Sequence, residues 1–324
     1  MAWLVTGGAG YIGAHVVEDL LAAGHKVVVV DNLSTGLAER LPGAAALIRA
    51  DVRDVGGLCS AITEHTVRGV LHLAARKDVA ESTADPLRYY GENLEGLHAV
   101  LAAARYSEVR NFVYSSSAAV YGTPSTASVT EESPTDPENA YGRSKLIGEW
   151  MVADAAQAYG VHYAALRYFN VAGAGARHLG DIGETNLLPR LLRAVQEETP
   201  ATVFGGDYPT RDGSCVRDYI HVRDISGAHV RAVEALISGD ITGEVFNVGG
   251  GTGSTVLEMI DAVSRVTGRQ LPYKITERRP GDPAGVVASP EKIAGRLGWK
   301  TNRDLDEIVA SAWEAFLHSR RTGE

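Results

Sequence analysis

The chain of 324 residues carries a formal net charge of -9, with 45% hydrophobic and 22% charged residues. This balance is typical of a folded globular protein, and the acidic charge argues against nucleic acid and anionic membranes as partners. The two cysteines form no C-x-x-C pair and no zinc-spaced cluster with histidines, and no apolar run is long enough to span a bilayer. These features predict a cytoplasmic, reduced protein without structural metal.

The first predicted strand ends at Thr6 and breaks into closely spaced glycines before a helix predicted from about residue 14 to 23. The turn reads Gly7-Gly8-Ala9-Gly10-Tyr11-Ile12-Gly13 and matches both G-x-G-x-x-G and G-x-x-G-x-x-G. Such a turn cradles phosphate, because the helix N-terminus presents free backbone N–H groups and the positive end of its dipole. The next strand, 26–30, leads to Asp31, whose carboxylate is suited to an adenosine ribose and repels a 2′-phosphate. The sequence therefore predicts a dinucleotide site that prefers NAD to NADP.

Short apolar runs alternate with helical patterns up to about residue 170, which is typical of a Rossmann-type, doubly wound parallel sheet. Further strands are predicted at 46–49, 70–73, 111–115 and 163–168, and helical apolar spacing covers 94–104 and 146–158. Ligands of open α/β sheets bind at the carboxyl ends of the strands. Among the charges at that edge, Asp51 is suited to an adenine amino group and Lys77 to the cofactor pyrophosphate.

The regular alternation stops after residue 170, where glycines at 173, 175, 180 and 183 mark a long irregular connection. A helix is predicted at 187–197, followed by short strands and Gly/Pro-rich loops. A segment of this kind next to a ligand-binding edge predicts a smaller, mixed α/β substrate domain. The predicted division is a NAD-binding domain over 1–170 and a substrate domain over 171–324, with the chain free to cross back between them.

The sharpest catalytic signal is Tyr141-Gly142-Arg143-Ser144-Lys145, preceded by Ser117 at the end of a strand. Positions i and i+4 of a helix lie on one face, so Tyr141 and Lys145 are expected to point into the same space. A nearby ammonium favours the phenolate, so we expect the pKa of Tyr141 to lie below its usual value of about 10. Ser117 is placed to hydrogen bond both the phenol and a substrate oxygen. Together the three residues predict a tyrosine that acts as a general base.

Motifs distributed over nearly the whole chain, from Leu4 to about Trp313, resemble those of one family. This is the UDP-galactose 4-epimerase (UDP-glucose 4-epimerase) family of the extended short-chain dehydrogenase/reductase superfamily. The motifs are Thr6-Gly-Gly-Ala-Gly-Tyr-Ile-Gly13, Asp31-Asn-Leu33, Ser115-Ser-Ser-Ala-Ala-Val-Tyr-Gly122, Tyr141-Gly-Arg-Ser-Lys145, Arg167-Tyr-Phe-Asn-Val-Ala-Gly173, Asp207-Tyr-Pro-Thr210, Val216-Arg-Asp-Tyr-Ile-His-Val222 and Arg278-Arg-Pro-Gly-Asp282.

The resemblance implies epimerisation at C4 of a UDP-hexose, without net redox change. Tyr141 would take the proton of the sugar 4-hydroxyl while the C4 hydride passes to tightly bound NAD, and the 4-keto sugar would turn over and receive the hydride on its other face. Lys145 would lower the pKa of Tyr141 and bind the nicotinamide ribose. The implied cofactor contacts are Gly7, Gly10, Tyr11, Ile12, Gly13, Asp31, Asn32, Asp51, Val52, Ala74, Lys77, Ser115, Tyr141, Lys145 and Tyr168.

The resemblance also implies a set of contacts to the UDP-sugar, in which the two arginines hold the diphosphate and Asp282 the uridine ribose. The planar fork of arginine suits this task, because it meets phosphate oxygens in bidentate fashion. The implied substrate contacts are Ser117, Tyr141, Asn170, Asn186, Leu187, Val203, Phe204, Arg217, Arg279, Asp282 and Val286. A homodimer built on the helices near 94–104 and 142–158 is implied as well.

Two departures from the family pattern bear on substrate range and on the cofactor loop. Val286 stands where hexose-restricted relatives carry a bulky tyrosine, so UDP-N-acetylhexosamines are expected to be accepted too. Ala80 stands where the family usually has glycine, in the loop after Lys77. UDP-glucuronate and UDP-pentoses remain alternative substrates.

Two other functions are weaker alternatives. A nucleotide-sugar 4,6-dehydratase needs an acid/base pair after the active-site hydroxyl, and here Ala118-Ala119 follow Ser117. A non-catalytic dinucleotide-binding regulator has no reason to keep Ser117, Tyr141 and Lys145 together.

Overall fold

The computed structural model describes residues 1–183, 185–279 and 282–322. Pro280 and Gly281 of the Arg278–Asp282 motif, and the last two residues of the predicted substrate domain, lie outside the described residues.

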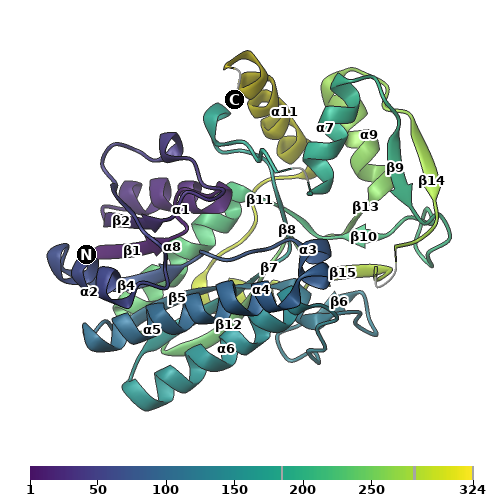
Figure 1. The fold of residues 1–324 in the computed structure, drawn as a ribbon. Coiled ribbons are helices and arrows are strands. Elements are labelled where there is room, and N and C mark those ends of the chain that lie inside the picture. Colours follow the sequence, from purple (N-terminus) through teal and green to yellow (C-terminus); the bar gives the residue numbers. More distant parts are fainter. Residues whose placement is uncertain (184, 280–281, 323–324) are drawn as a thin grey trace.

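A seven-stranded, fully parallel sheet forms the centre of the larger region (Figure 1). Its strands read as short apolar runs because both faces are covered, as in Lys26–Asp31, where five of six side chains are buried. In spatial order the strands are β12 (Gly243–Val248), β7 (His162–Tyr168), β5 (Asn111–Ser117), β4 (Val67–His72), β1 (Ala2–Thr6), β2 (Lys26–Asp31) and β3 (Ala46–Arg49). The strand order reverses beside β1, so the glycine turn that leaves β1 opens at the switch point of the sheet.

Helices cover both faces of this sheet, and each face has its own apolar core (Figure 1). One face carries α1 (Tyr11–Ala22), α8 (Val222–Ser238) and α10 (Glu291–Leu297). The other carries α2 (Val55–Glu64), α5 (Gly96–Tyr106) and α6 (Ala140–Tyr159). The fold is therefore the predicted Rossmann-type, doubly wound α/β sheet. Because β12, α8 and α10 follow residue 170, the chain crosses back from the second region into this sheet.

The smaller region packs three helices around a third apolar core, and the pair of β9 (Ala201–Phe204) and β14 (Tyr273–Thr276) lies on its outer side (Figure 1). These helices are α7 (Leu187–Gln196), α9 (Val256–Thr267) and α11 (Leu305–Thr322). The short strands pair as β14 with β9, β11 (Tyr219–His221) with β8 (Asn170–Ala172), and a mixed sheet in the order β13 (Ser254–Thr255), β10 (Val216–Arg217), β15 (Gly285–Ala288), β6 (Ser128–Val129).

Several element boundaries differ from the sequence prediction for identifiable reasons. Helix α1 begins at Tyr11 rather than near residue 14, because the glycine turn enters the helix directly. Helix α6, which was predicted to carry Tyr141 and Lys145, begins at Ala140, because the Asn139 side chain accepts a hydrogen bond from the Gly142 N–H at 2.9 Å and caps the helix. Helix α5 is preceded by α3 (Val79–Ala84), α4 (Pro86–Tyr90) and a π turn at Gly91–Glu95.

No helix in the part of the chain that the structure describes is long and apolar enough to cross a membrane. The same described residues contain no cluster of three or more His, Cys, Asp or Glu side chains arranged to hold a metal ion.

Candidate active site

The glycine turn has the geometry of a phosphate cradle. Gly7 has φ +70°, and a Cβ there would lie 2.7 Å from the Ala74 N atom. A Cβ on Gly13 would lie 2.2 Å from the Gly7 carbonyl oxygen, so the first turn of α1 packs directly on the turn. Gly10 caps α1 without a side-chain hydrogen bond, and no acidic residue stands in the first turn. The helix therefore offers backbone N–H groups and a positive dipole end to an anion, which fits a dinucleotide pyrophosphate.

Asp31 is buried where the glycine turn meets the end of β2. Its carboxylate accepts hydrogen bonds from the Ala9 N–H at 3.0 Å and the Leu33 N–H at 2.9 Å. A carboxylate has about four lone-pair positions, so these two bonds leave acceptor capacity for ribose hydroxyls. Asp31 thus fixes the turn and keeps a negative charge beside it, as a preference for NAD requires.

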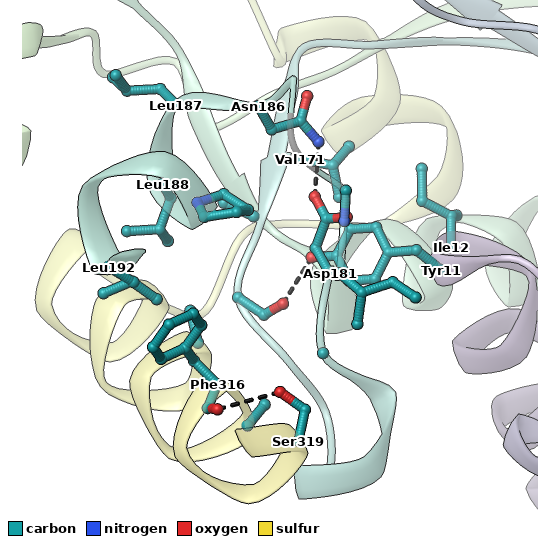
Figure 2. Close-up of a pocket in the computed structure, with 18 of the residues that line it drawn as sticks. Tyr11, Ile12, Val171, Asp181, Asn186, Leu187, Leu188, Leu192, Phe316 and Ser319 are labelled. Atoms are coloured by element: carbon teal, nitrogen blue, oxygen red, sulfur yellow. Dashed lines mark hydrogen bonds between the residues drawn. The ribbon is translucent and has the colours of Figure 1, made fainter. Parts of the chain in front are cut away.

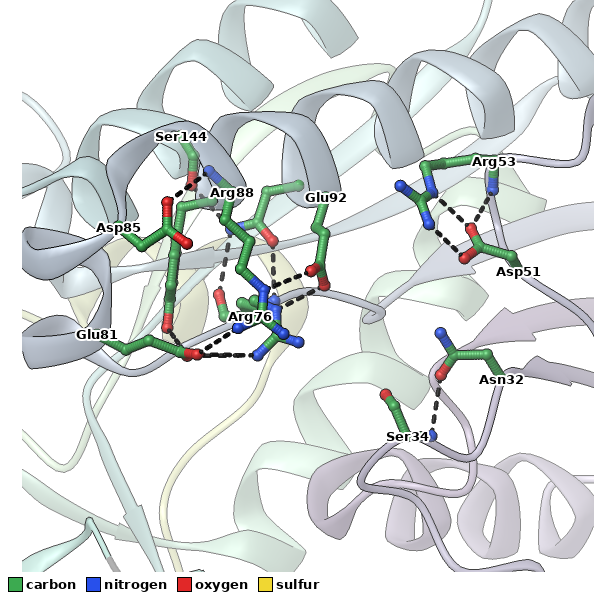
Figure 3. A network of polar contacts seen from close by, with 12 residues as sticks. Asn32, Ser34, Asp51, Arg53, Arg76, Glu81, Asp85, Arg88, Glu92 and Ser144 are labelled. Carbon is green, nitrogen blue, oxygen red and sulfur yellow. Dashed lines mark hydrogen bonds and ion pairs between the residues drawn. The ribbon is translucent and has the colours of Figure 1, made fainter.

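The next strand ends carry a network of charges around the cofactor edge (Figure 3). Asp51, predicted to meet an adenine amino group, pairs with Arg53 at 2.7 Å, and the hydrogen bond from Arg53 lowers the pKa of Asp51 to about 2. Arg76 contacts Glu92 at 2.6 Å and Glu81 at 3.2 Å. These contacts hold the start of the loop that presents the exposed side chain of the neighbouring Lys77, which lines the cleft described below.

The loop after Lys77 does not extend freely over the cofactor edge but turns into helix α3. Asp78 starts this helix by accepting a hydrogen bond from the Glu81 N–H at 2.8 Å. Arg76 is also fixed through its main chain, because its N–H donates to the Asn93 Oδ1 atom at 2.8 Å and its carbonyl accepts from Asn93 at 3.1 Å. The departure at Ala80 therefore lies in an ordered helical turn.

Ser117, Tyr141 and Lys145 come together at the carboxyl end of β5. Ser117 is the last residue of that strand, and Tyr141 lies in the first turn of α6. Both line the cleft. Lys145 follows Tyr141 by one turn, is buried, and donates a hydrogen bond from Nζ to the Ser115 carbonyl at 2.7 Å. The hydroxyl, phenol and ammonium predicted to act together thus approach the cleft from a strand end and the adjacent helix.

The expectation that Lys145 lowers the pKa of Tyr141 is wrong for the structure as it stands. Burial raises the pKa of the Tyr141 phenol, and a hydrogen bond from Ser117 opposes that rise. Burial lowers the pKa of Lys145 to about 7, and the charge of Glu149 acts against this. The cost of removing both charged forms from water therefore outweighs the effect of the nearby ammonium.

Three buried polar contacts support the site and were not predicted from the sequence. Glu149, a further turn along α6 from Lys145, forms a bidentate pair with Arg167 on β7, with distances of 2.9 and 2.7 Å. Ser116 donates a short hydrogen bond to Glu149. Tyr168, at the end of β7, donates a short hydrogen bond to His229 of α8. Glu149 continues the i+4 spacing of Tyr141 and Lys145, which is a usable sequence signal, whereas no local pattern points to His229.

A cleft of about 1100 Å³ lies between the two regions and is lined by some residues of each predicted ligand half. From the cofactor side it is lined by Tyr11, Ile12, Lys77, Ser117, Tyr141 and Tyr168. From the substrate side it is lined by Asn170, Asn186 and Leu187, and it continues to Leu192 of α7 and Phe316 of α11 (Figure 2). Asn186 donates a hydrogen bond to Asp181 at 2.6 Å, which fixes the start of α7 at the cleft wall.

The remaining predicted substrate residues gather beside the cleft, around β9, β10 and β15. Arg217 pairs with Asp282 at 2.6 Å, and the Arg279 guanidinium lies over the Phe204 ring at 3.7 Å from its centroid. Val203, on the same strand as Phe204, is buried in the core of the smaller region. These residues form one group but are not among those lining the cleft.

Val286 is buried in a small apolar cluster rather than exposed in the cleft. It packs with Val120, Tyr121 and Phe169, and Phe169 does line the cleft. A change of volume at Val286 therefore acts on the cleft through Phe169.

Comparisons with known proteins agree on one family. The family model described as NAD dependent epimerase/dehydratase family matches residues 3–249. The UDP-glucose 4-epimerase of Lacticaseibacillus casei is 42% identical over 320 residues, which cover 97% of this chain and 96% of that protein. The structure of UDP-glucose-4-epimerase from Stenotrophomonas maltophila with bound NAD and formylated UDP-arabinopyranose has a TM-score of 0.96 and 40% identity, covering 99% of both chains. The UDP-Glc/GlcNAc 4-epimerase from Campylobacter jejuni has a TM-score of 0.86 and 35% identity, covering 97% of this chain and 98% of that one.

Proposed function

Since the chain belongs to the NAD dependent epimerase/dehydratase family, we propose that it inverts C4 of UDP-glucose and UDP-galactose through a transient 4-keto sugar. The observation that carries the proposal is the convergence of Ser117, Tyr141 and Lys145 at the carboxyl end of β5. The same sheet edge holds the glycine turn, from which α1 begins without a side-chain cap. Ala118 and Ala119, which follow Ser117, hold no group able to move protons, so dehydration is disfavoured.

The chain's own residues account for positioning and proton movement. Ser117 hydrogen bonds the phenol of Tyr141 and is placed to bind the sugar 4-hydroxyl, whose proton Tyr141 removes and later returns. Lys145, fixed by the Ser115 carbonyl, supplies positive charge beside this pair. Bound NAD supplies the hydride acceptor, and its cationic nicotinamide favours the phenolate.

The cofactor is held by residues of the larger region. The N-terminus of α1 and Lys77 bind the pyrophosphate, and Asp31 binds the adenosine ribose and disfavours NADP. Retention of NAD through the whole cycle follows from a reaction that returns the hydride to the sugar.

The UDP half binds against the smaller region. Arg217 and Arg279 hold the diphosphate, since both are anchored by neighbours that orient their guanidinium planes. Asp282 binds the uridine ribose, and Asn170 and Asn186–Leu187 complete the wall of the cleft.

The substrate range extends to UDP-N-acetylhexosamines. Val286 is smaller than tyrosine and lies against Phe169, so the wall of the cleft is able to move away from a bulky 2-substituent. The similar Campylobacter jejuni enzyme is named for both UDP-Glc and GlcNAc, which supports this reading. The formylated UDP-arabinopyranose in the Stenotrophomonas maltophila structure keeps UDP-pentoses as an alternative.

The proposed enzyme acts in the cytoplasm as a homodimer. Helices α4, α5 and α6 lie together on one side of the sheet (Figure 1). Leu87 of α4 is 80% exposed and Trp150 of α6 is 57% exposed. Large apolar side chains exposed on neighbouring helices are typical of a subunit contact. Light scattering after size exclusion tests the dimer, and polar substitution of Leu87 and Trp150 is expected to give monomers.

The experiment that tests the function is incubation of the purified protein, without added cofactor, with separate UDP-sugars. The panel holds UDP-galactose, UDP-glucose, both UDP-N-acetylhexosamines, UDP-glucuronate and UDP-xylose, and the readout is C4 configuration by NMR. Interconversion of UDP-galactose and UDP-glucose is expected. Release of water with a 4-keto-6-deoxy product, or no turnover by a protein that contains NAD, would contradict the proposal.

A further inference from the structure

The segment Gly173–Gly175 follows β8, the strand that begins at the candidate substrate residue Asn170, and is held on two sides by side chains of other elements. From α1, the Tyr11 hydroxyl donates to the Gly173 carbonyl at 2.6 Å, and the Gly175 N–H donates to the His15 Nε2 atom at 2.8 Å. From α11, the Ser311 Oγ atom accepts from the Ala174 N–H at 3.2 Å. Three consecutive residues therefore carry one long-range hydrogen bond each.

His15 is fully buried, and both of its ring nitrogens are engaged. Nδ1 lies 2.8 Å from the Tyr11 carbonyl, which only accepts, so this nitrogen carries the proton and Nε2 is the acceptor for Gly175. Burial lowers the pKa of His15 to about 3, so the ring stays neutral and keeps this acceptor at neutral pH. The rings of Tyr11 and His15 meet edge to face at 5.6 Å, which fixes the two side chains against each other.

Gly173 and Gly175 lie so close to neighbouring side chains that a larger residue would clash at either position. A Cβ on Gly175 would lie 2.6 Å from the His15 Cδ2 atom and 2.1 Å from the Arg223 Nε atom. Gly173 has φ +88°, and a Cβ there would lie 2.8 Å from the His221 Cδ2 atom. The loop therefore packs closely against α1 on one side and against the start of α8 on the other.

The contacts continue along the connection towards α7. Arg40, which follows the cofactor-side strand β2, donates to the Gly180 carbonyl at 2.8 Å. Asp181 then accepts from Asn186 at 2.6 Å, and Figure 2 shows Asp181 beside Tyr11 at the cleft wall. Gly173, Gly175 and Gly180 of this connection are therefore each hydrogen bonded to a side chain of the cofactor side.

We propose that His15, together with Tyr11, is a positioning residue that aligns the UDP-sugar wall of the cleft with the cofactor helix α1. His15 does not line the cleft, and it acts through Gly173–Gly175, which lies between Asn170 and Asn186–Leu187 in the chain. The inference rests on the proposed function, because it presumes that this wall binds a UDP-sugar.

The test compares His15→Leu, which removes the acceptor at similar volume, with His15→Gln, whose amide oxygen is able to replace Nε2. Leu58→Ala serves as a matched control, because it opens a buried site in α2 on the opposite face of the sheet. UDP affinity is measured by calorimetry. KM and kcat are measured from initial rates with UDP-galactose, and NAD content is measured by absorbance after the cofactor is released from the protein. His15→Leu is expected to raise the UDP dissociation constant and KM about tenfold, with kcat and NAD content within twofold of the parent. His15→Gln is expected to restore most of the affinity.

The outcomes separate the inference from the proposed function. A His15→Leu protein that binds UDP as tightly as the parent, or that loses NAD instead, overturns the positioning role. The same UDP defect in Leu58→Ala at equal loss of thermal stability also overturns it, because the effect would then be general destabilisation. If His15→Leu fails to fold, Tyr11→Phe is the second test, because it keeps the ring and removes the hydroxyl that binds the Gly173 carbonyl. Unchanged UDP affinity in Tyr11→Phe then refutes the positioning role. A parent protein that neither contains NAD nor binds UDP refutes the proposed function itself.

Discussion

Removal of Arg167 should destabilise the protein strongly, because it leaves the Glu149 carboxylate, one helical turn from Lys145, buried without a counter-ion. Both side chains are only 6% exposed, and the pair is bidentate at 2.9 and 2.7 Å. Breaking a buried ion pair by removing one partner typically costs about 3–5 kcal/mol. We therefore expect Arg167→Met to lower the free energy of unfolding by about 4 kcal/mol, a large part of the stability of an ordinary domain.

The double variant Arg167→Met/Glu149→Leu separates packing from charge. Replacing both partners by apolar side chains of similar size removes the unpaired carboxylate, so most of the lost stability should return. Activity should respond differently, because the charge of Glu149 opposes the burial that lowers the pKa of Lys145 to about 7. Without that charge, Lys145 loses its proton at lower pH, and the alkaline limb of the pH–rate profile should move towards lower pH in Glu149→Leu and in the double variant alike.

Urea unfolding at pH 7.5 measures the first effect, and initial rates with UDP-galactose across pH 6–9 measure the second. The slope of the unfolding free energy with urea serves as the check on two-state behaviour. The reasoning fails if Arg167→Met costs less than about 1 kcal/mol, or if the double variant is no more stable than the single one. A pH–rate profile that does not move in Glu149→Leu would separately refute the link to Lys145.

Further predictions concern the base, the substrate range, the cofactor and acid stability. Tyr141→Phe should lower kcat by about 10²–10⁴-fold with NAD retained, measured as UDP-galactose conversion. Val286→Tyr should reduce turnover of UDP-N-acetylglucosamine relative to UDP-glucose, and an unchanged ratio would refute the steric argument. Asp31→Ala should relax the preference for NAD in a binding titration, and unchanged discrimination against NADP would remove Asp31 from that role. Stability should fall as the pH drops from 6.5 towards 4, because unfolding lets four histidines take up protons while Asp218, whose pKa burial raises to about 6, gives one up. Near pH 5 the unfolding free energy in urea titrations should therefore change by roughly 4 kcal/mol per pH unit, and a flat pH dependence would contradict the burial of His15, His72, His221 and His229.

The strands and the cofactor edge were predictable because their signals are local. A strand buried on both faces reads as an uninterrupted apolar run, and Lys26–Asp31 and Ala46–Arg49 appear within one residue of the prediction. Parallel strands bring their carboxyl ends to one edge, so Ser117 could be placed at the ligand-binding edge without knowledge of any long-range contact.

The supporting contacts were not predictable because their partners are distant in the sequence. His15 meets Gly175, 160 positions away, and His229 meets Tyr168, 61 positions away. A single histidine in a helix gives no periodic signal that separates a buried acceptor from a surface side chain. β12 likewise reads only as a short strand, and its pairing with β7 depends on how α8 packs on the sheet.

The error on Tyr141 shows why local charge rules are incomplete inside a fold. An ammonium lowers the pKa of a phenol only when its charge outweighs the desolvation of both groups, and here burial raises the pKa of Tyr141 and lowers that of Lys145. In the protein alone Tyr141 is therefore a protonated phenol and a poor base. A positive charge brought into the cleft next to Tyr141 favours the phenolate that proton removal needs. Because oxidised nicotinamide is cationic and reduced nicotinamide is neutral, the same burial ties the strength of the base to the step of the cycle at which a proton must leave the sugar.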